Sequence, residues 1–290
     1  MEQILKNRLF LIVLCGLTLI SGIYGKGKED QVGEEKKVRI GFLPDPGALP
    51  LILMEDVEAI PFMSAKERDI ALAAGELDGI SGDMIGLFHF EKSGSPLKIL
   101  TLTECRFFIT AHPDHQNDEV YQVGISENTV IEYLVDILLE GEQVEKVAVP
   151  KVPVRLEMLR TGKLPMACLS DGLAWPLLAD GFVNLRDQAE TDLTPTVLAF
   201  SQRFLDENPG RAESLRASWN DAVGKINADT EKYHPLLLEA IRLPNSEDFP
   251  MPHFKEVTLP TEEYFNSVKE WYESKYDLKL DITREDKVIR

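Results

Sequence analysis

The sequence is poor in cysteine and histidine, and it has no excess of positive charge. Three cysteines and five histidines occur among 290 residues. Cys105 and Cys168 could pair, but they fall in different predicted strand–helix units, so we expect two separate buried thiols. Lysine and arginine number 31 against 49 acidic residues, which gives a formal net charge of -18. Phosphate backbones would repel such a chain, so nucleic acid is not an expected partner.

Sequence motifs of common enzyme classes are also missing. The chain contains no G-x-S-x-G nucleophile motif, no phosphate-binding G-x-x-x-x-G-K-[ST] loop and no G-x-G-x-x-G dinucleotide motif. His112 and His115 flank Pro113-Asp114 and could in principle bind a metal ion. A histidine pair beside a proline in a loop is, however, more typical of a solvent-exposed segment. We therefore predict no catalytic residues, no metal and no cofactor, and a chain that is not an enzyme.

The longest hydrophobic run, Leu9–Ile20, is shorter than the about 20 residues that a membrane-spanning helix needs. Lys6 and Arg8 precede it, and the small residues Ser21, Gly22 and Gly25 follow it. This pattern is typical of a secretory signal, so residues 1–25 are a predicted signal peptide and residues 26–37 a polar tether. The expected location is periplasmic or extracytoplasmic. An uncleaved anchor is an alternative, and lipidation at Cys15 fits the pattern poorly.

Beyond residue 37, a strand–helix order occurs twice. The first unit has predicted strands at 38–42, 57–62 and 79–81 and predicted helices at 65–74 and 84–91. The second unit has predicted strands at 122–125, 144–149 and 166–169 and predicted helices at 126–139, 154–161 and 174–179. Chance similarity between two βαβ units is an alternative explanation. The repeated order nevertheless predicts two α/β lobes with mainly parallel sheets.

The two units align with a constant offset over most of their length. At an offset of 87, the identical pairs are Val57 and Val144, Glu58 and Glu145, Arg68 and Arg155, Leu72 and Leu159, Gly75 and Gly162, and Leu77 and Leu164. The opening strands align at an offset of 83, with Gly41 on Gly124. The repeat is followed by a strand-like run at 194–200. Two helical stripes close the chain, through Leu215, Trp219, Val223 and Ile226 and through Tyr264, Val268, Trp271 and Tyr272, and both are typical of core packing.

Five segments of the chain resemble the substrate-binding proteins of ABC importers, in the branch that binds aliphatic sulfonates, nitrate and thiamine precursors. The segments are Val38–Pro50, Leu72–Met84, Val123–Val135, Val147–Met158 and Val197–Pro209. The resemblance implies a two-lobed periplasmic-binding-protein fold with two strand-like hinge crossings, near 100–109 and 194–200. Lobe I would comprise residues 38–104 and 197–290, and lobe II residues 105–196. The ligand would lie in the cleft between the lobes.

Ligands of open α/β sheets bind beyond the carboxyl ends of the strands. That rule and the predicted crossings select the expected ligand-binding residues, which are Pro44, Asp45, Ser64, Asp83, Met84, Glu104, Arg106, Ser126, Asn128, Thr129, Ser170, Asp171 and Thr196. Several have simpler alternatives. Ser126 and Asp83 could cap the helices that follow them, and Asp45 could favour its Pro-Asp-Pro-Gly turn. Trp175 could stack on a flat ligand, although it more often fills a core.

Five acidic residues, Asp45, Asp83, Glu104, Glu127 and Asp171, fall at or near the predicted cleft. Crowded carboxylates repel one another in a cleft of low dielectric constant. We therefore expect an amino-bearing, nitrogenous ligand rather than a plain anion. The alternative is that some of these acids face solvent or cap helices. The resemblance implies a monomeric solute-binding component that needs a separate permease and ATPase. A binding-fold enzyme of pyrimidine or cofactor-precursor metabolism and an exported interaction module remain alternative functions.

Overall fold

The computed structural model describes residues 36–188, 196–243 and 245–289. The predicted signal peptide and residues 26–35 of the predicted tether lie outside this part of the chain. Lys36 and Lys37 are exposed and precede the first strand. Within the described ranges, no helix combines the length and the hydrophobicity needed to cross a membrane.

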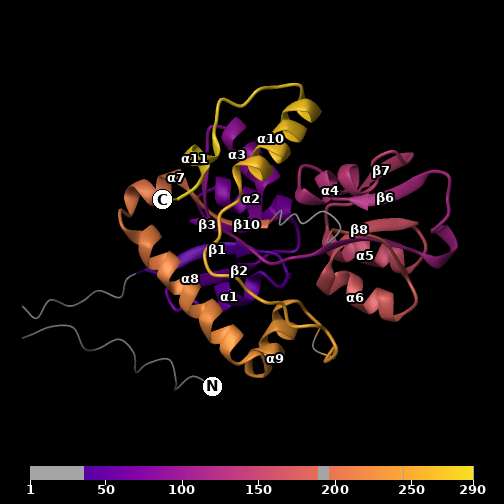
Figure 1. Ribbon diagram of the computed structural model, residues 1–290, viewed down its shortest axis with the longest axis horizontal. Helices are drawn as coiled ribbons and strands as arrows, with labels where there is room; N and C mark the ends of the chain where they lie inside the picture. Colours follow the sequence, from indigo (N-terminus) through magenta and orange to yellow (C-terminus); the bar gives the residue numbers. More distant parts are fainter. Residues whose placement is uncertain (1–35, 189–195, 244, 290) are drawn as a thin grey trace, which may run out of the picture. The chain divides into compact units, whose positions relative to one another are not determined.

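The first sheet has five strands in the order β2-β1-β3-β10-β4 (Figure 1). Its strands are β1 (Val38–Phe42), β2 (Val57–Pro61), β3 (Gly79–Asp83), β4 (Leu97–Leu102) and β10 (Thr196–Ser201). The pairs of β1 with β2 and β3 are parallel, whereas β10 runs antiparallel to both β3 and β4. The intervening helices are α1 (Ala48–Leu53), α2 (Ala65–Ala73) and α3 (Met84–Lys92). We refer to this sheet and the helices packed on it as lobe I.

The second sheet repeats this arrangement with the order β7-β6-β8-β5-β9. Its strands are β5 (Phe107–Ala111), β6 (Tyr121–Ile125), β7 (Val144–Ala148), β8 (Met166–Ser170) and β9 (Val183–Asp187). The pairs of β6 with β7 and β8 are parallel, whereas β5 runs antiparallel to both β8 and β9. Its helices are α4 (Val130–Leu138), α5 (Val152–Arg160) and α6 (Asp171–Ala179), and a short 3₁₀ turn, η1 (Pro113–His115), follows β5. This sheet and its helices form lobe II.

The strand registers reproduce the sequence repeat. In lobe I, Val38 pairs with Val57 and Ile40 with Gly79. In lobe II, Tyr121 pairs with Val144 and Val123 with Met166, so the partners are related by the same offsets of 83 and 87. The predicted fold class, two α/β lobes with mainly parallel central strands flanked by helices, is therefore confirmed.

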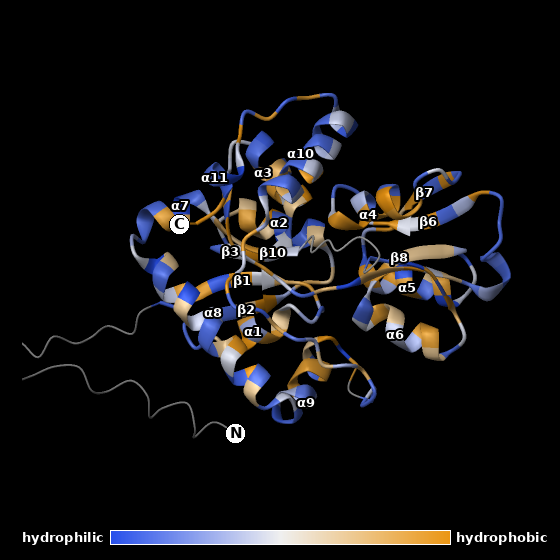
Figure 2. Cartoon of the chain, in the orientation of Figure 1, coloured by the Kyte–Doolittle hydropathy of each residue, from blue (hydrophilic) through white to orange (hydrophobic). Residues whose placement is uncertain are grey.

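The C-terminal helices are α7 (Gln202–Glu207), α8 (Arg211–Ala228), α9 (Thr230–Ala240), α10 (Glu262–Tyr276) and α11 (Arg284–Lys287). All four residues of the predicted stripe on α8 are buried, and Figure 2 shows α8 alternating between hydrophobic and hydrophilic bands. On α10, Val268 and Tyr272 are buried, whereas Tyr264 and Trp271 are only half-buried. Phe265 is fully buried and lies edge-on to Phe88 of α3, with 5.4 Å between ring centroids. Helix α10 is thus anchored on lobe I.

The same helix also contacts lobe II. Its Lys275 Nζ lies 2.7 Å from Glu132 Oε1 of α4, and the Trp271 indole N–H donates to Asp136 Oδ2 at 3.2 Å. The Tyr276 hydroxyl donates to Asn128 Oδ1 at 2.5 Å. One hydrophobic cluster continues from Phe265 and Tyr272 on α10 to buried residues of α4. Helix α10 therefore contacts both lobes.

Several elements differ from the sequence-based prediction. Strand β9 was not predicted, and the predicted crossing near 100–109 is two strands, β4 and β5, each of which pairs antiparallel within its own sheet, outside the repeated βαβ pattern. Helix α6 begins at Asp171 rather than at residue 174, with its acidic first residue in the turn where the helix dipole favours negative charge. Cys105 and Cys168 are buried and unpaired, as predicted.

Candidate functional site

A small cavity of about 50 Å³ lies where the strand ends of the two lobes meet. We call it the inner cavity. Its walls are formed by Leu43, Asp45, Ala65, Arg68, Ser81, Gly82, Asp83 and Thr196 from lobe I, and by Phe107, Ser126, Thr129, Val130, Ile131, Pro150, Val152 and Arg155 from lobe II. The lobes touch beside it, where the Val152 backbone N–H donates to the Met63 carbonyl at 3.3 Å. These strand ends are where ligands of open α/β sheets bind.

Asp83 is a buried carboxylate in this cavity. It is the last residue of β3 and caps α3, since its side chain accepts from the Gly86 backbone N–H at 2.8 Å. Burial raises the pKa of Asp83, although Arg68 and the backbone N–H groups of Gly86 and Val130 act to lower it. The capping role suggested by the sequence and a position on the cavity wall are therefore combined in one residue.

Asp45 and Asp171 interact through their charges close to the cavity. Burial, reinforced by the charge of Asp171, raises the pKa of Asp45 to about 7. Burial also raises the pKa of Asp171 to about 7, against the lowering effect of the Gly172 backbone N–H, which donates to its carboxylate at 2.8 Å. Near neutral pH both groups are therefore only partly ionised, and a cation placed between them would favour their charged forms.

Arg68 contributes a buried cation from α2. Its guanidinium donates to Asp69 through Nε at 2.9 Å and through Nη2 at 2.8 Å, and its Nη1 donates to the Ser81 carbonyl at 2.6 Å. Nε and Nη2 both donate to the same oxygen, Asp69 Oδ1, so one partly exposed carboxylate neutralises this charge.

Arg155 contributes a second buried cation from α5, on the lobe II side. The residue is 1% exposed, and its Nη1 donates to the Val149 carbonyl at 2.8 Å. Its Nε is buried without a hydrogen-bond partner. Burial lowers the pKa of Arg155 to about 10, which still leaves the guanidinium charged at neutral pH.

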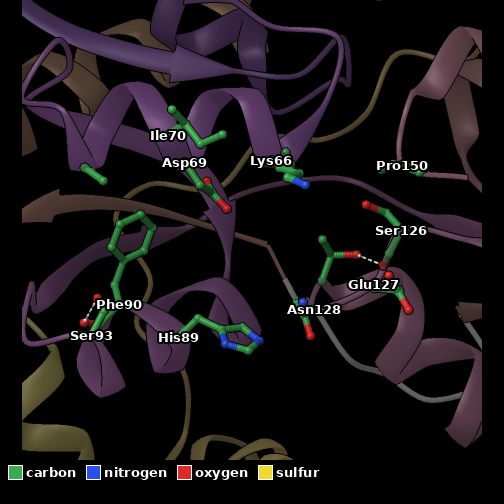
Figure 3. A pocket seen from close by; sticks show the side chains of 13 residues that line it. Lys66, Asp69, Ile70, His89, Phe90, Ser93, Ser126, Glu127, Asn128 and Pro150 are labelled. Carbon is green, nitrogen blue, oxygen red and sulfur yellow. Dashed lines mark hydrogen bonds between the residues drawn. The ribbon is translucent and has the colours of Figure 1, made fainter. Parts of the chain in front are cut away.

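A larger pocket of about 420 Å³, which we call the outer pocket, adjoins the inner cavity and shares Ala65, Ser126, Thr129 and Pro150 with it. Asp69 of α2, His89 of α3 and Asn128 of the β6–α4 loop reach it from three elements (Figure 3). The outer pocket therefore borders the inner cavity on the side of α2 and α3.

The loop before α4 supplies the lobe II wall of both spaces. Thr129, not Ser126, caps α4, because its Oγ1 accepts from the Ile131 backbone N–H at 3.2 Å. The alternative that Ser126 caps this helix is therefore wrong, and Ser126 instead lies buried on the wall, with its carbonyl accepting from Thr129 Oγ1 at 2.7 Å. Asn128 has a φ of 61°, and its backbone N–H donates to Glu132 at 2.9 Å.

Five predicted ligand-binding residues line the inner cavity, and a sixth lines the outer pocket alone. The inner cavity receives Asp45, Asp83, Ser126, Thr129 and Thr196, of which Ser126 and Thr129 also line the outer pocket, while Asn128 lines only the outer pocket. Thr196 holds the crossings together, since its Oγ1 donates to the Thr103 carbonyl at 2.9 Å.

The other predicted ligand-binding residues lie outside the walls of these two spaces. Glu104 is 3.7 Å from Lys255, and Arg106 is paired with Asp187 at 2.5 Å. Four more are buried next to wall residues, namely Pro44, Ser64, Met84 and Ser170. Asp171 is linked to the site through its charge interaction with Asp45. Trp175 packs against Phe249, with 5.6 Å between ring centroids, in a lobe I cluster, as expected for core filling.

Sequence reasoning missed the two cavity arginines as site residues. Arg106 is the only cation among the expected ligand-binding residues. The structure instead places Arg68 and Arg155 on the cavity wall, one from each lobe. The sequence signal that could have identified both arginines is the offset of 87, which places Arg68 and Arg155 at equivalent positions of the repeat. Two arginines at equivalent positions of a repeat lie at the same depth in each lobe, and strand ends of both lobes meet at the cleft.

No protein-family model matches the chain, and no curated protein is similar to it in sequence. Solved structures do match. The alkanesulfonate-binding protein SsuA from Xanthomonas axonopodis pv. citri, bound to MOPS, superposes with a TM-score of 0.73 at 14% identity, over 89% of this chain and all of that chain.

Two further structures have the same fold. The ligand-binding component of an ABC-type import system from Staphylococcus aureus, with zinc bound, gives a TM-score of 0.72 at 15% identity, over 88% of this chain and 97% of that chain. The periplasmic nitrate-binding protein NrtA from Synechocystis PCC 6803 gives a TM-score of 0.59 at 14% identity, over 75% of this chain and 68% of that chain. At this identity the matches establish architecture. The chain has the two-lobed fold of the periplasmic binding proteins.

Proposed function

We propose that this protein is the solute-binding component of an ABC importer, which captures a small molecule between its lobes and releases it unchanged. The single observation that carries the proposal is the inner cavity, where buried charged side chains from both lobes meet at the strand ends. Buried charges are costly unless a partner compensates them. A bound solute would supply that compensation only when both lobes surround it.

The proposed solute carries an amino group. Asp45 and Asp83 line the cavity, and neither forms an ion pair with a lysine or arginine of the described chain. An ammonium group of the solute would pair with these carboxylates and favour their ionised forms. Lobe closure around the solute, export to an extracytoplasmic space and delivery to a separate permease and ATPase complete the proposal.

A thermal-shift screen of metabolites against the purified protein tests the proposed function. A solute present at 100 times its Kd should add about 2.7 kcal/mol to the free energy of unfolding. For a protein of this size, that stabilisation corresponds to a rise in Tm of roughly 5–10 °C. The matched variant Asp83→Asn keeps a side chain that can cap α3 but removes the charge, and it should weaken an amino-bearing solute by about 1–3 kcal/mol. A screen without a single stabilising solute would contradict the proposed function.

A further inference from the structure

Three cations are buried in the part of the chain that the structure describes, and they differ in their partners. Arg68 is paired with Asp69, and Lys287 with Glu91. Arg155, the least exposed of the three, has no carboxylate partner among the described residues and donates only to a neutral carbonyl. An unpaired buried charge is strongly unfavourable, so a partner from outside the described chain would stabilise Arg155.

The internal repeat provides a reference for what is missing. The Cγ of Arg155 lies against Gly124 in lobe II, as the Cγ of Arg68 lies against Gly41 in lobe I. The offset of 87, however, places Leu156 at the position of Asp69, and Ser170 at the position of Asp83. Lobe II therefore has the arginine of the repeat without either of the acids that surround it in lobe I.

The opposite wall has the complementary imbalance. Asp45 and Asp83 present carboxyl groups from lobe I. The Val130 backbone N–H at the start of α4 already acts on Asp83. Of the cavity groups, this leaves the guanidinium of Arg155 as the cationic donor of lobe II that no protein carboxylate occupies.

From this charge arrangement we infer that the solute is a small zwitterion, whose oxyanion group binds Arg155 while its ammonium group faces Asp45 and Asp83. The inference rests on the proposed function and narrows its amino-bearing solute to a molecule with both charges. The cavity of about 50 Å³ restricts the solute to a few non-hydrogen atoms in this conformation. Carboxylate and sulfonate groups share the chemistry that an arginine fork recognises.

Calorimetric titration of the full chain with a matched series of probes tests the charge requirement. β-Alanine and taurine carry both charges and differ only in the oxyanion, whereas propionate lacks the amine and propylamine lacks the acid. At least one zwitterion should bind about tenfold or more tightly than either singly charged probe, since each lost charged hydrogen bond costs roughly a factor of ten or more. The comparison of β-alanine with taurine identifies the oxyanion.

Substitutions in lobe II test the role of Arg155. Arg155→Met should weaken the preferred zwitterion by about tenfold or more and should not weaken propylamine, whose ammonium group the guanidinium repels. Leu156→Asp restores the acid that lobe I has at this position, and its carboxylate should occupy Arg155 Nε and Nη2 as Asp69 occupies those atoms of Arg68. Leu156→Asp should therefore also weaken the zwitterion, by about tenfold, although the arginine is still present. Leu156→Asn, of the same shape without the charge, is the matched control and should bind like the unmodified protein.

The outcomes separate this inference from the proposed function. If neither zwitterion binds more tightly than propionate and propylamine, the inference is overturned, whereas a different solute found by the metabolite screen would leave the proposed function standing. Equal loss of binding in Leu156→Asp and Leu156→Asn would also overturn it, because the effect would then come from packing rather than from charge.

Discussion

Asp45 and Asp171 link the inner cavity to pH at the scale of single residues. Both carboxyl groups have a pKa of about 7, against an ordinary value of 3.8, because burial disfavours their charged forms. A raised pKa means that the folded state binds these protons more tightly than the unfolded chain does. Their contribution to stability is therefore complete below about pH 4 and is lost as the pH rises towards about 7.

The variant Asp45→Asn should remove the share of this pH dependence that belongs to Asp45. Asparagine resembles the protonated acid at every pH, so the variant should gain stability relative to the unmodified protein between pH 5 and pH 8. Each pH unit over which Asp45 is protonated only in the folded state contributes up to about 1.4 kcal/mol. Urea denaturation of both proteins across this range measures the difference.

The comparison between two proteins is needed because other groups titrate as well. Burial and nearby Lys92 lower the pKa of His89, which acts in the opposite direction. Arg68, Asp171, Glu104 and Cys105 lie around Asp45 and are present in both proteins. A stability difference that stays constant with pH would contradict the assignment of a raised pKa to Asp45.

At the scale of elements, Gly41 of β1 and Gly124 of β6 allow side chains of the following segments to pack closely on the strands. A Cβ on Gly124 would collide with the Leu164 side chain and approach Arg155 Cγ to 3.3 Å, and a Cβ on Gly41 would approach Leu77 Cδ1 to 2.6 Å. These pairs correspond in the repeat, so the same glycine–leucine–arginine contact is built twice. The arginines therefore owe their position to the close approach of helix and strand.

Gly124→Ala should destabilise the fold by about 1–3 kcal/mol, the usual cost of overpacking a core. Gly224 of α8 is the matched control, because a Cβ there meets no atom within 4 Å. Gly224→Ala should instead stabilise the protein by roughly 0.5–1 kcal/mol through its higher helix propensity. Denaturation midpoints of the two variants should move in opposite directions, and a shift of Gly124→Ala towards higher stability would refute the packing argument.

The repeated elements could be predicted from the sequence because each is a local pattern. Hydrophobic strand runs, helix stops at Gly75 and Gly162, and the identities at a fixed offset all lie within short segments. Strand β9 could not be predicted in this way, since its only partner among the described strands, β5, lies more than 70 residues away in the chain and outside the repeat. The acidic part of the candidate site could likewise be predicted, because Asp83 ends a strand and begins a helix. The unpaired state of Arg155 depends on which side chains surround it in space, and spacing along the chain carries no such information.

At the scale of the whole molecule, α10 and the inner cavity both involve residues of the two lobes, so both bear on how the lobes open and close. The described conformation has the lobes in contact through Val152 and Met63 and through the pair of Lys275 and Glu132. We predict that the ligand-free protein also populates a form in which the lobes separate, because a solute must enter a cavity that both lobes enclose. Small-angle scattering should show a smaller radius of gyration after a confirmed ligand is added, and identical profiles would reject closure.

Lys275→Met should shift this equilibrium towards the open form. The variant removes one half-buried ion pair between α10 and α4, worth about 1 kcal/mol, and should therefore lower ligand affinity roughly fivefold. Lys225→Met, which removes an ion pair to Asp221 within α8, is the control and should leave affinity unchanged.

The described ends of the two crossings are bonded to each other where they enter lobe I. The Thr103 backbone N–H donates to the Thr196 carbonyl at 3.0 Å, and Thr196 Oγ1 donates back to the Thr103 carbonyl. Two separate tethers would allow the lobes to tilt, twist and slide independently. Bonds between the lobe I ends of both crossings should tie their movements together. We therefore expect the lobes to move mainly along one bending coordinate, so that a solute which stabilises one contact across the cavity also favours the others.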